Sequence, residues 1–138
     1  VAGLLSQMWR SRKKVMLVFL LLTGVSIVVF LNAEGMSAQQ FIWLALFLGF
    51  ASGYWATFVT IASEQFGTNL RATVTTTVPN FVRGSLVLAT ISFTALKADM
   101  GIINSAMLVG FVSIIIALIA LSQLKETFGK DLDYVEIS

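Results

Sequence analysis

The sequence predicts an all-α integral membrane protein with four transmembrane helices, and three observations lead to this class. Of the 138 residues, 57% are hydrophobic and only 12% are charged. The mean hydropathy of +0.90 is well above that of a water-soluble domain, which needs more polar residues to cover its core. Four long apolar runs alternate with short polar segments, and a helix of about 20 such residues crosses a bilayer.

The four runs define the expected spans and the connections between them. At about 1.5 Å per residue, the run from Val15 to Leu31 covers about 25 Å and crosses a bilayer together with its flanks. The expected transmembrane helices are residues 15–31, 41–62, 73–96 and 102–121. The expected connections are residues 1–14, 32–40, 63–72, 97–101 and 122–138.

The basic residues predict how the chain is oriented. They precede the first span, separate the second from the third and follow the fourth: Arg10, Arg12, Lys13, Lys14, Arg71, Lys125 and Lys130. The two opposite connections contain only Lys97. Because cytoplasmic loops are enriched in Lys and Arg, residues 1–14, 63–72 and 122–138 are expected in the cytoplasm. We therefore expect a protein of the cell (inner) membrane with a cytoplasmic C-terminus.

The residue types present in this chain argue against several functions. It has no cysteine and no histidine, and its expected spans contain no Asp or Glu. The usual groups for catalysis and for soft-metal binding are missing, so we expect no enzyme, no metal site and no cofactor. A net charge of +2 is too small to indicate nucleic-acid binding. A coupling proton would need a carrier outside these spans.

The second span differs from the first and fourth, which are apolar around most of their circumference. Small residues recur at every fourth position from Ala45 through Gly49 and Gly53, and such a ridge permits close helix contact. We interpret Gly49 and Gly53 as helix-packing residues. Tyr54 and Trp55 either fill space between helices or contact a ligand in a central cavity.

The third span carries a polar stripe that includes Asn80, Arg83 and Thr90. Arg83 follows Arg71 by twelve positions, about 18 Å along a helix, which places it deep in a bilayer. A charge there costs about 3 kcal/mol, so Arg83 should face a wet cavity or a partner. Its counter-charge is expected outside this chain, in Glu64 if the helix bends, or on a ligand.

Pro79 lies one turn before Arg83 in the same span. Its ring removes the backbone hydrogen bond to the carbonyl of Thr75 and predicts a kink. Neighbouring threonine hydroxyls are able to satisfy the groups that the proline leaves free. The kink is either a static adjustment for packing or a bend where a gating helix flexes.

Three polar segments together resemble the motifs of one family. Residues 64–71, Glu-Gln-Phe-Gly-Thr-Asn-Leu-Arg, resemble the Glu-x-Phe-Pro-Thr-x-x-Arg signature between the tenth and eleventh helices of the major facilitator superfamily, especially its sugar and metabolite porters. Residues 125–133, Lys-Glu-Thr-Phe-Gly-Lys-Asp-Leu-Asp, resemble the Pro-Glu-Thr-x-Gly-x-x-Leu sequence after the twelfth helix. Residues 3–14 are a degraded match to the Gly-x-Leu-x-Asp-x-x-Gly-Arg-Arg loop, without its aspartate and second glycine.

The resemblance implies a C-terminal fragment that covers helices nine to twelve of a twelve-helix major facilitator fold. It implies a secondary active transporter that moves a small solute by alternating access, with a proton or sodium ion as the candidate coupling ion. Its partners are then the substrate, the lipid bilayer and the missing N-terminal helices. In such porters the residues matching Glu64 and Arg71 form ion pairs that latch the cytoplasmic side. The candidate substrate-cavity residues are Arg83, Asn80, Tyr54, Trp55 and Thr90.

Other functions stay open from the sequence. A self-contained four-helix assembly or structural subunit would associate through the ridge of Gly49 and Gly53. A small four-helix exporter that works as a dimer is a third class, but such proteins keep an acidic residue in the first helix, and residues 15–31 have none. Within the transporter hypothesis, an anionic substrate and a carboxylate of the missing helices account equally well for Arg83.

Overall fold

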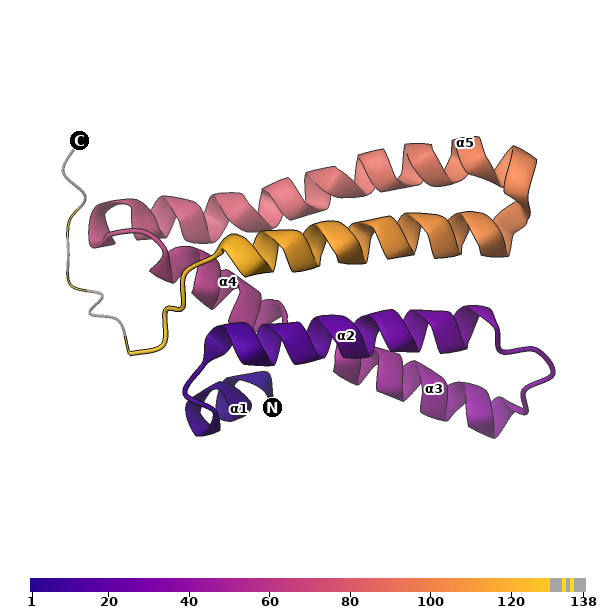
Figure 1. Cartoon of the computed structure of the whole chain (residues 1–138), viewed down its shortest axis with the longest axis horizontal. Coiled ribbons are helices and arrows are strands. Elements are labelled where there is room, and N and C mark those ends of the chain that lie inside the picture. The colour runs from indigo at the N-terminus through magenta and orange to yellow at the C-terminus, as the bar shows by residue number, and fades with distance from the viewer. Residues whose placement is uncertain (130–132, 134, 136–138) are drawn as a thin grey trace.

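The computed structural model describes residues 1–129, 133 and 135, and this part of the chain is all-helical (Figure 1). Its helices are α1 (Ala2–Met8), α2 (Arg12–Leu31), α3 (Ala38–Ala51), α4 (Trp55–Glu64) and α5 (Thr68–Gln123). Three helical stretches are long and apolar enough to cross a membrane, namely α2, Ala38–Glu64 and α5. The prediction of an all-helical chain with helices of membrane-spanning length is confirmed at this level, and the structure is consistent with a membrane protein.

Helix α5 is 56 residues long and reverses its direction at Gly101. Gly101 has φ 77° and ψ 173°, a backbone conformation that is readily accessible only to glycine. In Figure 1 the helix runs out along one side of the molecule, turns and comes back alongside itself. We call residues 68–100 the first limb and residues 102–123 the second limb. The expected connection at 97–101 is therefore reduced to a reversal at one residue.

Helix α2 lies at the centre and contacts all the other helices. Val15 and Phe19 are buried against α1, whereas Met16 and Leu20 pack with Ile61 of α4 and with the second limb. Lipid tails are as apolar as these side chains, so contacts between helices in a bilayer depend on close packing. This packing joins α1, α2, α4 and the second limb at one end of the molecule.

The second expected span is a broken helix. Helix α3 ends at Ala51 and α4 begins at Trp55, with a turn between them. The hydroxyl of Thr23 in α2 is shared between Phe19 O of its own helix at 2.8 Å and Ala51 O of α3 at 3.0 Å. The hydroxyl of Ser52 donates to Leu48 O at 2.7 Å. A break at membrane depth is tolerated where freed backbone groups find such partners. The expectation of one continuous helix is corrected here, because the uncharged run is interrupted at Ser52 and Gly53 and the break has a partner on α2.

The two end segments also differ in detail from the sequence expectation. Residues 1–14 were expected as a loop, but they contain α1 and the first turn of α2. Of the expected tail, residues 122–138, the structure describes 122–129, 133 and 135. Lys130, which contributed to the predicted orientation, lies outside the described residues.

Candidate functional site

Apart from Thr23, the polar side chains that are seen to connect different helices gather at one end of the molecule. At this end α1, the start of α2, the junction of α4 with α5 and the end of α5 lie near one another (Figure 1). We call this group the polar end. It consists of Ser11, Arg12, Lys13, Glu64, Gln65 and Glu126. These residues come from the three segments that carry the family resemblance, so the structure brings those segments together.

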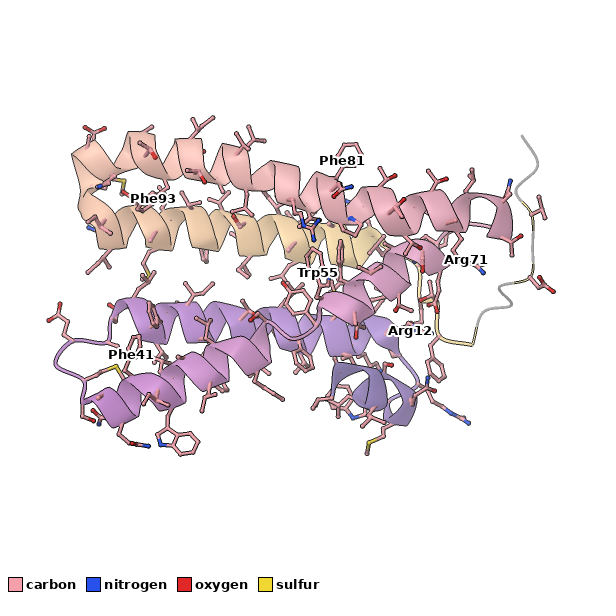
Figure 2. All side chains as sticks on the ribbon, turned by 180° about the vertical axis from the view of Figure 1, so that it is seen from behind. Arg12, Phe41, Trp55, Arg71, Phe81 and Phe93 are labelled. Carbon is pink, nitrogen blue, oxygen red and sulfur yellow. The ribbon has the colours of Figure 1, made fainter. Side chains whose placement is uncertain are left out.

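An ion pair between Arg12 and Glu64 joins α2 to α4. The distance from Arg12 Nη2 to Glu64 Oε1 is 2.6 Å, and the two side chains are 20% and 6% exposed. Figure 2 shows Arg12 lying beneath the end of α4. A charge this deeply buried is strongly destabilising when its partner is removed, because the remaining charge is left unpaired. The pair therefore fixes the first turn of α2 to the last turn of α4.

Glu126 caps the N-terminus of α2 from the segment that follows α5. Its carboxylate accepts hydrogen bonds from the Ser11 hydroxyl, from Arg12 N at 3.0 Å and from Lys13 N at 3.4 Å. Partial burial acts to raise the pKa of Glu126, but the hydrogen bonds from Ser11 and from backbone N–H groups outweigh it, so the pKa lies below its ordinary value. A carboxylate is favoured here because the free N–H groups of a helix start carry partial positive charge.

The opposite charge arrangement is found at the C-terminus of α5. Lys13 Nζ donates to Ser122 O at 3.2 Å and also to Leu124 O. Gln65 Nε2 donates to Lys125 O at 2.8 Å. A cation is favoured at the carbonyl end of a helix, as an anion is at the other end. The start of α2 and the end of α5 therefore satisfy each other's terminal groups.

Arg71 was predicted to share a gate with Glu64. The structure pairs Glu64 with Arg12, and Arg71 Nη2 donates to the carbonyl of Phe66 at 3.3 Å, so the shared gate stays a prediction. Both arginines lie at this end of the molecule (Figure 2). From the sequence, Arg12 was predicted only as one of the cytoplasmic positive charges, and Glu126 was not predicted to make a contact with α2. Ser11 was detectable as a helix N-cap, since it precedes an apolar run, whereas the capping by Glu126 is a long-range contact with no local signal.

Tyr54 and Trp55 line an apolar cavity of about 250 Å³ between α2, α4 and both limbs of α5. Val82 of the first limb and Leu20 of α2 contribute to the same wall. The rings of Trp55 and Phe58 lie 5.5 Å apart. No charged side chain is among the described residues that line this cavity. The structure thus brings two of the five candidate cavity residues together in an apolar setting.

The other three candidates, Asn80, Arg83 and Thr90, are exposed on the first limb. Arg83 Nη1 donates to Asn80 Oδ1 at 3.4 Å, and Asn80 Nδ2 donates to Thr76 O at 3.1 Å. Glu64 is engaged by Arg12, so the structure does not use it as the counter-charge of Arg83. The half-buried Phe93 lies on a different helical face from Arg83, whereas the half-buried Pro79 precedes Arg83 by one turn on the same face.

Pro79 and the two glycines of the predicted ridge occupy different settings. The first limb stays helical through Pro79, and the only residue of α5 with non-helical backbone angles is Gly101. At Gly49 an added Cβ would meet nothing within 4 Å, so no neighbouring helix approaches there. At Gly53 it would meet Phe50 O at 3.0 Å, within the turn between α3 and α4. Gly53 therefore lies in a tight turn, where a side chain would crowd the backbone of α3.

The fold and its polar end define a helical protein with helices of membrane-spanning length, held together at one end by charged and polar contacts. In residues 1–129, 133 and 135, no cluster of acidic side chains is suited to hold a metal ion. No protein-family model, curated protein or solved structure matches the chain.

Proposed function

We propose that this chain is the C-terminal part of a secondary active transporter of the major facilitator type, which moves a small solute by alternating access. The observation that carries the proposal is the polar end. Three segments that resemble one family's motifs are separated by up to about 120 positions in the sequence, yet they contact one another through Arg12, Glu64 and Glu126. Convergence of this kind supports a shared role for the three motifs.

In this proposal the polar end belongs to the cytoplasmic gate. The Arg12–Glu64 pair and the Glu126 cap hold the four spans together as one body, because they join α2, α4 and the chain after α5. Arg71 lies at the start of the first limb and is the candidate for pairing with the other half of the transporter. Exposed ion pairs contribute only about 1 kcal/mol or less, which suits a contact that must break in every cycle.

The break between α3 and α4 supports a moving part within the second span. Broken helices are common in secondary transporters, where they surround binding sites near the middle of the membrane. Tyr54 is the N-cap of α4 and Trp55 is its first residue, and both line the apolar cavity. A change in the turn at Gly53 would move both rings, so this turn is the proposed hinge of the cavity.

The exposed stripe of Asn80, Arg83 and Thr90 supports a polar surface that faces further helices of the same transporter. A guanidinium placed against lipid at this depth would cost about 3 kcal/mol or more. A water-filled cavity removes that cost, and there Arg83 would attract either an anionic group of the substrate or a carboxylate of the missing helices. The proposed setting is the cell (inner) membrane with the polar end in the cytoplasm and a proton or sodium ion as coupling ion.

A labelling experiment tests this proposal without knowledge of the substrate. The chain has no cysteine of its own, so Thr90→Cys provides a single reporter in a full-length protein cleared of other cysteines. A membrane-impermeant maleimide is added from the side that bears Arg71. If Arg71 helps to close the gate, Arg71→Gln should raise the labelling rate by up to about fivefold, the factor that corresponds to about 1 kcal/mol.

Arg10→Gln is the matched control for this experiment. Arg10 lies on the same side, and its guanidinium makes no hydrogen bond or ion pair with the described residues. It should leave the labelling rate unchanged. Equal rates for wild type and Arg71→Gln would contradict the gate.

A four-helix assembly or structural subunit is the second candidate function. The observation that favours it is the large apolar surface of the first limb, where Phe81 is 76% exposed and Leu88 is 69% exposed. Figure 2 shows Phe81 pointing away from the other helices. Such a surface also suits lipid or the missing helices of a transporter. A reporter at Thr90→Cys whose labelling never depends on the gate residues would favour the subunit.

A further inference from the structure

A long apolar groove of about 610 Å³ lies between α2 and the second limb of α5. Glycines leave its centre open, with Gly24 on α2 and Gly110 on the second limb. An added Cβ at Gly110 would meet Ile27 at 3.8 Å, and one at Gly24 would meet Ile114 at 3.9 Å. These are ordinary contact distances, so any larger side chain at these positions would extend into the groove.

The walls of the groove are apolar and leave no side-chain hydrogen-bonding group in need of a partner. They are formed by aliphatic, aromatic and methionine side chains, including Leu21, Met107 and Phe111. The one polar side chain, Asn104, donates from Nδ2 to Met100 O at 3.1 Å. Methionine side chains adapt to irregular apolar shapes. The groove therefore suits a flexible hydrocarbon chain better than a helix that would need interhelical hydrogen bonds.

Two lysines lie where the groove approaches the polar end. Leu118 lines both the groove and a neighbouring hollow of about 220 Å³, which Lys13, Lys14 and Ser122 also line. Lys13 Nζ donates to two carbonyls, and an ammonium group has three donors. The Lys14 ammonium makes no hydrogen bond or ion pair with any residue that the structure describes. The apolar groove and the hollow lined by two lysines are therefore neighbours that share the side chain of Leu118.

We propose that this groove binds one anionic phospholipid, with an acyl chain along the groove and the phosphate beside Lys13 and Lys14. The lengths agree, because Leu118 and Asn104 are fourteen positions apart, about 21 Å along a helix. One leaflet of a 30 Å hydrocarbon core is about 15 Å deep, so the groove accommodates the chain over that whole depth. Basic pockets between transmembrane helices are suited to anionic headgroups. The proposal requires only that the chain lies in a bilayer, and it is independent of transport.

Native mass spectrometry of the protein in detergent tests the proposal with defined lipids. Phosphatidylglycerol and phosphatidylcholine with identical acyl chains are added at equal concentration. The wild type should retain one molecule of phosphatidylglycerol, with at least about fivefold preference over phosphatidylcholine, the factor contributed by one lysine near the surface. Equal retention of the two lipids would overturn the proposal.

Lys14→Gln tests the headgroup contact, and Lys97→Gln is its control at the opposite end of the molecule. Both lysines are exposed, so neither substitution disturbs a buried contact. Lys14→Gln should reduce the preference for phosphatidylglycerol by about fivefold, whereas Lys97→Gln should leave it unchanged. A preference that survives Lys14→Gln, or that falls equally in both variants, would contradict the assigned site.

Gly110→Leu tests the groove, and Gly84→Leu is its matched control in the same helix. An added Cβ at Gly84 would meet nothing within 4 Å, so the control adds the same side chain outside the groove. Gly110→Leu should abolish retention of both lipids while Gly84→Leu retains them. Unchanged lipid retention in Gly110→Leu would overturn the proposal. A wild-type dimer that is disrupted by Gly110→Leu but not by Gly84→Leu would also overturn it, because a second copy of the chain would then occupy the groove. Circular dichroism checks folding, and the Lys14 variant remains decisive if Gly110→Leu unfolds.

Discussion

The polar end and the first limb of α5 differ in how their polar side chains are satisfied. At the polar end, Arg12, Lys13 and Glu126 bind groups of other helices or of distant segments. Along the first limb, from Thr75 to Thr94, the observed side-chain hydrogen bonds stay within the limb. Thr94, for example, donates only to the carbonyl of Thr90, at 2.8 Å.

This difference separates a part of the molecule that makes polar contacts between its own helices from a part that depends on its surroundings. Even at the polar end, Arg12 Nε and Glu64 Oε2 are buried without a hydrogen-bond partner among the described residues. The polar end builds its own network, and its geometry follows from residues of this chain. On the first limb, Arg83 makes a hydrogen bond only with Asn80 of the same limb, and large apolar side chains such as Phe81 are exposed. Its environment in the membrane must come from lipid, water or further helices. Substitutions should therefore affect folding strongly at the polar end and weakly along the first limb.

The largest expected effect on stability is found by replacing one arginine with glutamine in each region and comparing the two variants. Arg12→Gln should lower the free energy of unfolding by roughly 2–3 kcal/mol, because it leaves the carboxylate of Glu64 buried without its cation. The estimate lies below the usual cost for a fully buried pair, since Arg12 retains 20% of its exposure. Arg83→Gln should change the free energy by less than about 0.5 kcal/mol. Equilibrium unfolding in mixed micelles, followed by circular dichroism, measures both.

The double variant Arg12→Met with Glu64→Leu sharpens this test. It removes both charges and keeps apolar volume, so it should recover most of the stability lost in Arg12→Gln. Equal losses of unfolding free energy in Arg12→Gln and Arg83→Gln would contradict the distinction between the two regions. A double variant no more stable than Arg12→Gln would show that the cost does not arise from an unpaired charge.

The fold was predictable where composition alone decides it. The apolar runs gave the helical class and their approximate positions, because a long uncharged stretch has few alternatives to a helix in a bilayer. The break between α3 and α4 was not predictable, since it depends on Thr23 of another helix donating to Ala51 O. The reversal at Gly101 is also tighter than the polar segment around Lys97 suggested.

The candidate site was predictable only in part, for a related reason. Glu64 and Arg71 are apparent from the sequence because charges are rare in this chain. Their partners are not apparent, since the Arg12–Glu64 pair joins residues 52 positions apart and depends on how α2 packs on α4. Tyr54 and Trp55 line the same cavity, but whether that cavity is polar depends on the side chains that other helices contribute.

An intermediate effect is expected where the broken helix depends on α2. Thr23→Val keeps the shape of the side chain but removes the hydroxyl that donates to Ala51 O, so it should cost about 1 kcal/mol. Thr94→Val is the control, because its hydroxyl donates only within its own helix. The same unfolding measurement should show little change for the control. Equal stability of the two variants would show that the break does not need support from α2.

The smallest expected effect concerns Glu126 and is best detected through pH. Its pKa in the folded chain is lowered, so its carboxylate stabilises the fold fully above the ordinary value of 4.5. That contribution is lost as the pH falls below 4.5 and through the lower folded pKa. Glu126→Gln should therefore lower the free energy of unfolding by about 0.5 kcal/mol near neutral pH. It should also reduce the loss of stability on acidification. Unfolding measured between pH 3 and pH 7, in steps, checks both expectations.

Glu34→Gln is the control for this last prediction, since Glu34 is exposed and its carboxylate makes no hydrogen bond or ion pair with the described residues. It should leave the dependence of stability on pH as it is in the wild type. High salt should reduce the effect of Glu126→Gln, because a charge at an exposed helix end is screened. If Glu126→Gln and Glu34→Gln respond alike to pH, the capping of α2 contributes no stability, and the polar end depends on the Arg12–Glu64 pair.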